Sequence, residues 1–336
     1  MRINPFQYLT KLLVQSTRKF VPYGLLIILA VIAETIVKGV YRDVLILGAI
    51  NAIICVGAIT TNSIAGLFSL GFGGIALVAS YAAALFTLPP SYKLVFLDLP
   101  HSLATVHWSF VPALLVGVSI AVLAGLIFVI PSLRLRGHYF ILITLGLNII
   151  FSNLAINLRS WTHGPLGIRN IPFFTNGWWA FGALLVVICF SQRFSQTRFG
   201  RALKTIGRDE VLAASLGINV PLYKLLAFII SSVIIGLGGI LWVHYIGSMH
   251  PNVFDLNFVF LIVAMYALGG SESIWGAILG AFLITSFMHL ARPIQEGFTL
   301  FGYKIPPLMG LMQVLISLIL IITMIFRPSG LIKKRA

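Results

Sequence analysis

Ten long apolar runs, separated by short polar or charged gaps, are the dominant feature of this sequence. Hydrophobic residues make up 59% of the chain and charged residues only 9%, against roughly 25% charged residues in ordinary soluble domains. Such a chain cannot hide its apolar surface from water, and a membrane-spanning helix needs about 20 apolar residues. The sequence therefore predicts an all-α integral membrane protein, a polytopic bundle of about ten transmembrane helices. The predicted spans are 21–37, 44–62, 75–90, 109–130, 139–157, 177–191, 223–246, 257–270, 275–290 and 306–326.

The basic residues indicate how these spans are oriented. The net charge is +15, but the Lys and Arg residues lie mostly between the apolar runs and at the termini, which indicates membrane orientation and not a nucleic-acid surface. With the N-terminus in the cytoplasm, 16 of the 23 basic residues fall in cytoplasmic segments, as the positive-inside rule requires. Both termini are therefore predicted to be cytoplasmic, and the first 20 residues to be a cytoplasmic segment and not a cleaved signal. No polar stretch is long enough for a soluble domain, so residues 1–336 are predicted to form one membrane domain.

The sequence contains no pattern typical of an active site or a metal site. It has no phosphate-binding GxxxxGK[ST] loop, no HExxH, no CxxC and no GxSxG elbow. Cys55 and Cys189 lie inside apolar runs, where a thiol behaves as a small hydrophobic group, and the seven histidines are scattered. We therefore predict no catalytic residue, no metal site and no ATP hydrolysis within this chain.

A charged segment at residues 192–224 interrupts the apolar runs. It carries six basic residues, and Phe199, Leu203 and Ile206 recur at helical spacing, with Ala213 and Leu216 predicted to continue the apolar face. One interpretation is an amphipathic helix that rests on lipid headgroups. The other is a helix that docks into a groove of a cytoplasmic protein.

Two glycine-rich segments, 69–74 and 269–281, interrupt or border predicted spans. Close packing between helices is one explanation, and a broken helix whose backbone lines a cavity is the other. Polar residues inside spans are open to two readings as well, namely hydrogen bonds between helices or a polar lining for a solute. Thr144, Asn148 and Ser152 recur every four residues and so share a helix face. The candidates for the translocation path are Asn62, Ser69, Gly71, Thr144 and Asn148.

At these segments the chain resembles the permease subunits of branched-chain amino-acid ABC importers of the Liv type. Four blocks carry the resemblance, and the second, LRLRG-x-YF, looks most like the LivM member of the permease pair. The blocks are residues 69–74, 133–140 with 144–145, 200–224 and 269–281.

The resemblance implies a half-pore in a bacterial inner membrane that pairs with a LivH-like second permease, two cytoplasmic ATP-binding subunits and an external solute-binding protein. ATP and Mg²⁺ are then expected on the ATP-binding subunits, with no cofactor bound by this chain. The segment 192–224 becomes the coupling loop that rests on an ATPase. Import of urea, short amides or another small solute is the first alternative, and a stand-alone secondary transporter is a more distant one. The coupling residues carried over are Gly200, Arg201, Ala202, Leu203, Asp209, Glu210, Ala213, Ala214 and Gly217.

Overall fold

The structure is a computed structural model, and it describes residues 23–24, 26–132, 138–296, 299–300, 303–304, 310–327 and 329–332. The predicted N-terminal cytoplasmic segment and the LRLRG part of the resemblance, residues 133–137, lie outside the described residues. Long helices make up most of the chain, as predicted. They are α2 (Val40–Ile59), α3 (Phe72–Thr87), α6 (Phe110–Ser132), α7 (His138–Asn157), α9 (Gly177–Gln196), α12 (Val220–Ile246), α13 (Leu256–Gly269), α14 (Ile274–Glu296) and α15 (Leu311–Phe326).

The helices match the predicted spans one for one. Within the described residues, seven helices are long and apolar enough to cross a membrane, and α3 with α4 (Pro90–Phe96) makes an eighth if that bent pair is counted as one span. Two shorter apolar helices, Leu26–Thr35 and α15, correspond to the first and last predicted spans. The all-α membrane fold is therefore confirmed, because run length and apolar content are the properties that a bilayer selects.

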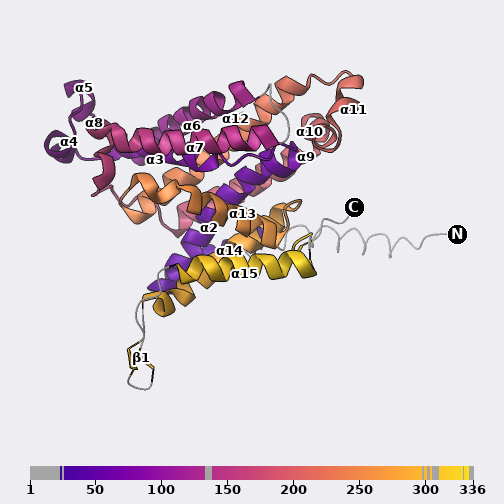
Figure 1. The fold of residues 1–336 in the computed structure, drawn as a ribbon. Helices are drawn as coiled ribbons and strands as arrows, with labels where there is room; N and C mark the ends of the chain where they lie inside the picture. The colour runs from indigo at the N-terminus through magenta and orange to yellow at the C-terminus, as the bar shows by residue number, and fades with distance from the viewer. Residues whose placement is uncertain are drawn as a thin grey trace, which may run out of the picture.

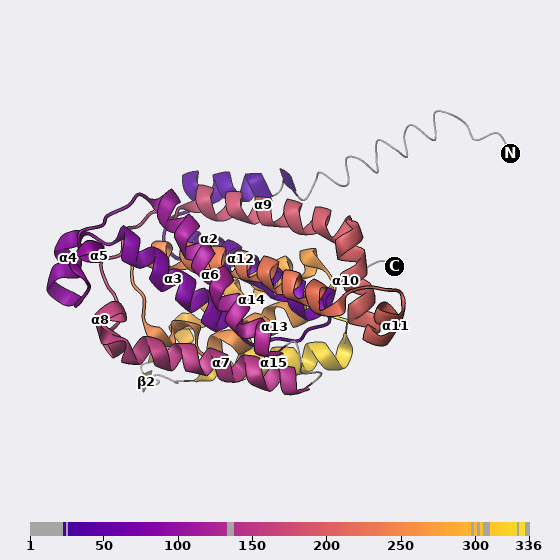
Figure 2. The ribbon, with the colours of Figure 1, turned by 90° about the horizontal axis from the view of Figure 1, so that it is seen from above.

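Short elements close the two ends of the bundle. At one end lie α4, α5 (His101–Ala104) and α8 (Arg159–Thr162), and at the opposite end lie α10 (Arg198–Arg208) and α11 (Glu210–Ser215), as both views show (Figure 1, Figure 2). The remaining elements are the π-helical turn η1 (Thr60–Ile64), the 3₁₀ turns η2 (Gly164–Leu166) and η3 (Pro251–Phe254), and the antiparallel strands β1 (Thr299–Leu300) and β2 (Tyr303–Lys304), with Thr299 opposite Lys304.

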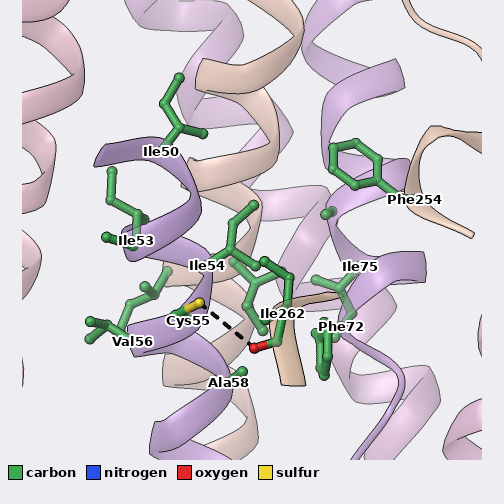
Figure 3. Close-up of a cluster of buried hydrophobic side chains, with 14 of the residues drawn as sticks. Ile50, Ile53, Ile54, Cys55, Val56, Ala58, Phe72, Ile75, Phe254 and Ile262 are labelled. Carbon is green, nitrogen blue, oxygen red and sulfur yellow. Dashed lines mark hydrogen bonds between the residues drawn. The ribbon is translucent and has the colours of Figure 1, made fainter. Parts of the chain in front are cut away.

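Helix α2 forms the centre of the bundle. It is buried without interruption from Gly48 to its end at Ile59, and it packs against α9, α12 and α14. Figure 3 shows its side chains Ile53, Ile54 and Cys55 facing the core, with the thiol of Cys55 3.9 Å from the carbonyl oxygen of Ile262 on α13. Lipid gives helices no hydrophobic drive to associate, and small residues at their contacts allow the backbones to approach closely. At one such contact the hydroxyl of Ser231 on α12 donates to the backbone carbonyl oxygen of Gly57 on α2 at 2.7 Å.

Glu34, the acidic residue placed within a predicted span, has a structural role. Its carboxylate accepts a hydrogen bond from the backbone N–H of Gly177 in the first turn of α9 at 2.5 Å and pairs with Arg42 at 2.7 Å. A carboxylate at a helix N-terminus interacts favourably with the helix dipole. Glu34 thus ties the helix Leu26–Thr35 to α9.

Beyond a bend of 113° from α3, the helix α4 is held by a buried lysine. Lys93 is almost fully buried, and its ammonium group donates to the carbonyl oxygen of Val106 at 2.5 Å. Desolvation lowers the pKa of Lys93 below its usual value. The lysine thereby closes the loop that carries α4 and α5.

Candidate functional site

Helices α10 and α11, which we call the coupling unit (residues 197–217), are two separate helices joined at Asp209. The hydroxyl of Thr197 accepts from the N–H of Gly200 at 3.1 Å and caps α10. The carboxylate of Asp209 accepts from the N–H groups of Val211 and Leu212 at 2.9 and 3.0 Å and caps α11. Both residues belong to the side-chain types that favour helix starts, so the sequence itself encodes the break between the two helices.

The apolar face of α10 packs on the protein. Leu203 and Ile206 are buried against the rest of the chain, and the ammonium group of Lys204 donates to the carbonyl oxygen of Ser195 at 2.8 Å. A Cβ atom at Gly200 would lie 2.2 Å from the carbonyl oxygen of Phe194, so this close approach to α9 requires glycine. Because the apolar face is already covered, α10 has no apolar stripe left to rest on lipid.

An ion pair fixes α11 to the membrane helix that follows. The carboxylate of Glu210 lies 2.8 Å from the ammonium group of Lys224 on α12, and the Lys224 side chain is only 7% exposed. Ala213 is the fully buried residue on the inner face of α11. Gly217 follows the end of the helix with a φ of 78°, which glycine adopts without strain. Four of the predicted coupling residues, namely Asp209, Glu210, Ala213 and Gly217, therefore set the position of α11.

The outer face of α11 exposes large apolar side chains, in contrast to the buried face of α10. Val211, Leu212 and Leu216 are 73%, 53% and 67% exposed. The expectation that Leu216 continues the buried face with Ala213 is wrong, because Asp209 starts a new helix in a new direction and the spacing does not carry across it. Among the remaining predicted coupling residues, Arg201 and Ala214 are exposed and Ala202 is partly exposed. Val211 and Leu212 were not among the residues predicted from the sequence to take part in coupling. They could have been recognised as two consecutive apolar residues directly after the helix cap Asp209.

A contact between two glycines joins the coupling unit to the interior of the bundle. A Cβ atom at Gly66 would lie 2.5 Å from the Cα atom of Gly207, the penultimate residue of α10. Gly66 has a φ of 67° and belongs to the irregular segment 65–71 between η1 and α3. Backbone therefore touches backbone at this point, with no room for a side chain between the two segments.

The segment 65–71 holds a buried polar cluster built from predicted path residues. The amide of Asn62 donates to the hydroxyl of Tyr266 at 2.9 Å and to the carbonyl oxygen of Ser69 at 3.3 Å, while its oxygen accepts from the Ser69 N–H at 2.9 Å. The hydroxyl of Thr144 accepts from the Leu70 N–H at 3.2 Å. The structure thus brings Asn62, Ser69 and Thr144 together around the irregular segment and adds Tyr266, which sequence spacing did not reveal.

Asn148 lies on the same face of α7 as Thr144, but its side chain has no hydrogen-bond partner within the described structure. It is fully buried, and neither polar atom of its amide is hydrogen-bonded. An unpaired buried polar group costs about 1–3 kcal/mol. Asn148 therefore differs from the hydrogen-bonded residues around Asn62.

Comparison with known proteins decides the family. The sequence model described as branched-chain amino acid transport system / permease component matches residues 40–325. The chain belongs to this family. It is similar to the high-affinity branched-chain amino acid transport system permease protein LivM of Escherichia coli, with 29% identity over 91% of this chain and 73% of that protein. It is also similar to the probable LivM permease of Methanocaldococcus jannaschii, at 23% over 66% and 70%, and to the Escherichia coli LivH permease, at 22% over 85% and 92%. No solved structure matches the chain.

Membership makes the chain a permease component, a multi-pass membrane protein of a transport system. Two features of this permease component stand out, namely the coupling unit and the buried polar cluster around Asn62. One is exposed at an end of the bundle and the other lies within it, and the contact between Gly66 and Gly207 links them. The arrangement suits a subunit that receives a movement at its surface and passes it to polar groups inside.

Proposed function

We propose that this chain is the membrane-spanning permease subunit of an ATP-driven importer and forms half of a translocation path for branched-chain or related aliphatic amino acids. Relatives of both the LivM and the LivH type support pairing with a second, homologous permease. We expect ATP and Mg²⁺ to bind to two separate ATP-binding subunits and a soluble binding protein to deliver the solute from outside. The observation that carries the proposal is the exposed apolar surface of α11 at an end of the bundle.

The surface of α11 has the chemistry of a docking helix. Val211, Leu212 and Leu216 supply apolar anchors, and Arg201 and Arg208 at the base of the same unit supply positive charge. A helix that lays apolar side chains into a groove of a partner is a recurrent recognition mode. The basic residues also support a cytoplasmic position for this end of the bundle, where ATP is available to the partner.

The proposed path of coupling runs from α11 to α10 and then to the segment 65–71. The ion pair between Glu210 and Lys224 and the buried Leu203 make the unit move as one body with the start of α12. Closure of the ATPases beneath α11 then displaces α10, and the glycine contact passes this displacement to the polar cluster around Asn62. Alternating access of the path results when these helices rock against those of the second permease.

Affinity purification of the tagged chain from its native membranes, in mild detergent, tests the docking surface. Combined replacement of Val211, Leu212 and Leu216 by Ser is expected to reduce the recovered ATP-binding subunits about tenfold or more, since burying each such side chain contributes roughly 1.5–3 kcal/mol and a tenfold change in affinity is about 1.4 kcal/mol. Recovery of the second permease should not change.

The matched control replaces three exposed apolar residues at the opposite end, Leu94, Val95 and Phe96 on α4, by Ser. This variant should keep its ATP-binding subunits. Equal recovery of ATP-binding subunits with both variants would contradict the proposed role of α11, and recovery of the wild-type chain alone would contradict the importer assignment itself.

A further inference from the structure

The N-terminus of α3 lies inside the bundle without a side-chain cap. The helix starts at Phe72 after the irregular segment 65–71. The N–H of Gly71 donates to the Ser69 hydroxyl at 3.2 Å, whereas the N–H groups of Phe72, Gly73 and Gly74 have no acceptor among the described residues. Residues 71–74 are all buried, so these donors lie inside the protein and not at its surface. They form the positive end of a helix dipole.

The unpartnered amide of Asn148 points at this helix end. A Cβ atom at Gly73 would lie 2.7 Å from the Asn148 side-chain oxygen, and one at Gly74 would lie 3.4 Å from it. Ser152, one turn further along the same face of α7, has a buried hydroxyl that also lacks a partner in the described structure. The Asn148 amide, with both donor and acceptor capacity, therefore stands unpaired beside a helix N-terminus, and the unpaired Ser152 hydroxyl lies one helical turn away from it.

An apolar pocket, partly open to the outside, begins about one helical turn from this point and runs along α3, α6 and α7. Its volume is about 340 Å³, and its walls include Leu77 and Val78 on α3, Ile120 on α6, and Phe151 and Leu154 on α7. Leu77 follows Gly74, and Phe151 follows Asn148, by about one helical turn. The ring of Phe151 stacks on Phe128 at 5.2 Å, and the Phe128 ring covers Gly71 and Gly74. The two phenylalanines thus connect the polar helix end to the apolar pocket.

From this juxtaposition we propose that the N-terminus of α3 and Asn148 bind the α-amino carboxylate group of the transported solute, and that the adjoining pocket takes its aliphatic side chain. The carboxylate accepts from the N–H groups of Phe72, Gly73 and Gly74, and the Asn148 oxygen accepts from the ammonium group. Broken membrane helices whose N-termini face an anionic group occur in other transporters. The inference rests on the proposed function and adds to it a site within this chain.

The structure shows this site closed. The Phe128 ring lies 2.4 Å from a Cβ position at Gly71, and Asn148 and the carbonyl oxygen of Phe254 fill the space beside Gly73. Binding therefore requires α6, which carries Phe128, and α7, which carries Asn148, to move away from the start of α3. The displacement passed from Gly207 to the segment 65–71 acts on the residues that lead directly into α3.

Replacement of Asn148 by Leu separates a binding role from a packing role. The two side chains have nearly the same shape, and removal of an unpaired buried amide should raise the thermal unfolding temperature of the assembled importer. Uptake of radiolabelled L-leucine into proteoliposomes, at saturating binding protein, should nevertheless fall about tenfold or more, while ATP hydrolysis continues. The matched control is Asn153→Leu, at an exposed position of α7, which should leave uptake unchanged.

A second variant covers the case in which Asn148→Leu does not assemble. Asn148→Asp places a carboxylate at the helix N-terminus, where it is favoured, and it should assemble but exclude the carboxylate of the solute, so that leucine uptake falls at least about tenfold. Wild-type uptake in either assembled variant would overturn the inference while leaving the importer assignment intact. A wild-type assembly without ATP-dependent leucine uptake would overturn the proposed function, and this inference with it.

Discussion

The contact between Gly66 and Gly207 leads to a quantitative prediction for Gly66→Ala. The new Cβ atom would lie 2.5 Å from the Gly207 Cα atom, whereas carbon atoms pack at about 3.5–4.0 Å, so α10 must shift by about 1 Å. Alanine at a φ of 67° costs about 1–2 kcal/mol, and overpacking costs about 1–3 kcal/mol more. The free energy of unfolding of the variant should therefore be about 2–5 kcal/mol lower than that of the wild type, unless α10 relieves the contact by staying displaced.

Two assays on the assembled importer measure these outcomes. Thermal unfolding in detergent reports the loss of stability, and the ratio of leucine transported to ATP hydrolysed in proteoliposomes reports the displacement of α10. We expect a lower unfolding temperature together with fewer leucine molecules transported per ATP. The control is Gly182→Ala in α9, where no atom lies within 4 Å of the new Cβ atom and alanine gains up to about 1 kcal/mol in helix propensity. A Gly66→Ala importer with wild-type stability and a wild-type transport ratio would refute the reasoning.

Three further experiments test the positions of individual helices. Asp209→Ala removes the cap of α11, which should cost about 1 kcal/mol and reduce the ATP-binding subunits recovered with the chain; unchanged recovery would contradict the need for an ordered α11. Glu210→Gln leaves the cation of Lys224 without this counter-charge and should lower the free energy of unfolding by roughly 1 kcal/mol. Adding Lys224→Met should recover this loss, and a double variant no more stable than Glu210→Gln alone would argue against the ion pair. Glu34→Gln weakens the contacts by which Glu34 links the helix Leu26–Thr35 and Arg42 to α9. It should lower the unfolding temperature without changing the number of leucine molecules transported per ATP. A change in that number would show that Glu34 takes part in coupling.

The membrane architecture was predictable from the sequence because it depends on local composition. A run of about 20 apolar residues is stable only across a bilayer, so each predicted span found its helix. The helix break within the coupling unit was also encoded locally, by Thr197 and Asp209 at positions that favour helix starts.

The parts that the sequence did not reveal depend on contacts between distant segments. Nothing in the residues around Gly66 indicates that Gly207 lies against it, and the partner of Asn62 on α13, Tyr266, is more than two hundred positions away in the chain. Hydrophobic periodicity placed Leu216 on a buried face, because the pattern alone does not show that Asp209 redirects the chain. The shared face of Thr144 and Asn148 was visible, but only the three-dimensional packing shows that one side chain is hydrogen-bonded and the other is not.

Leucine uptake by the reconstituted assembly tests the central claim most directly. The tagged chain, with the subunits that purify with it, is inserted into proteoliposomes with ATP and Mg²⁺ on the side of α11, and the binding protein with radiolabelled L-leucine on the other. The account predicts accumulation of leucine against its gradient only when ATP is hydrolysed and the partner subunits are present. Accumulation by the chain alone, without ATP and driven by an ion gradient, would contradict it and establish a self-sufficient transporter.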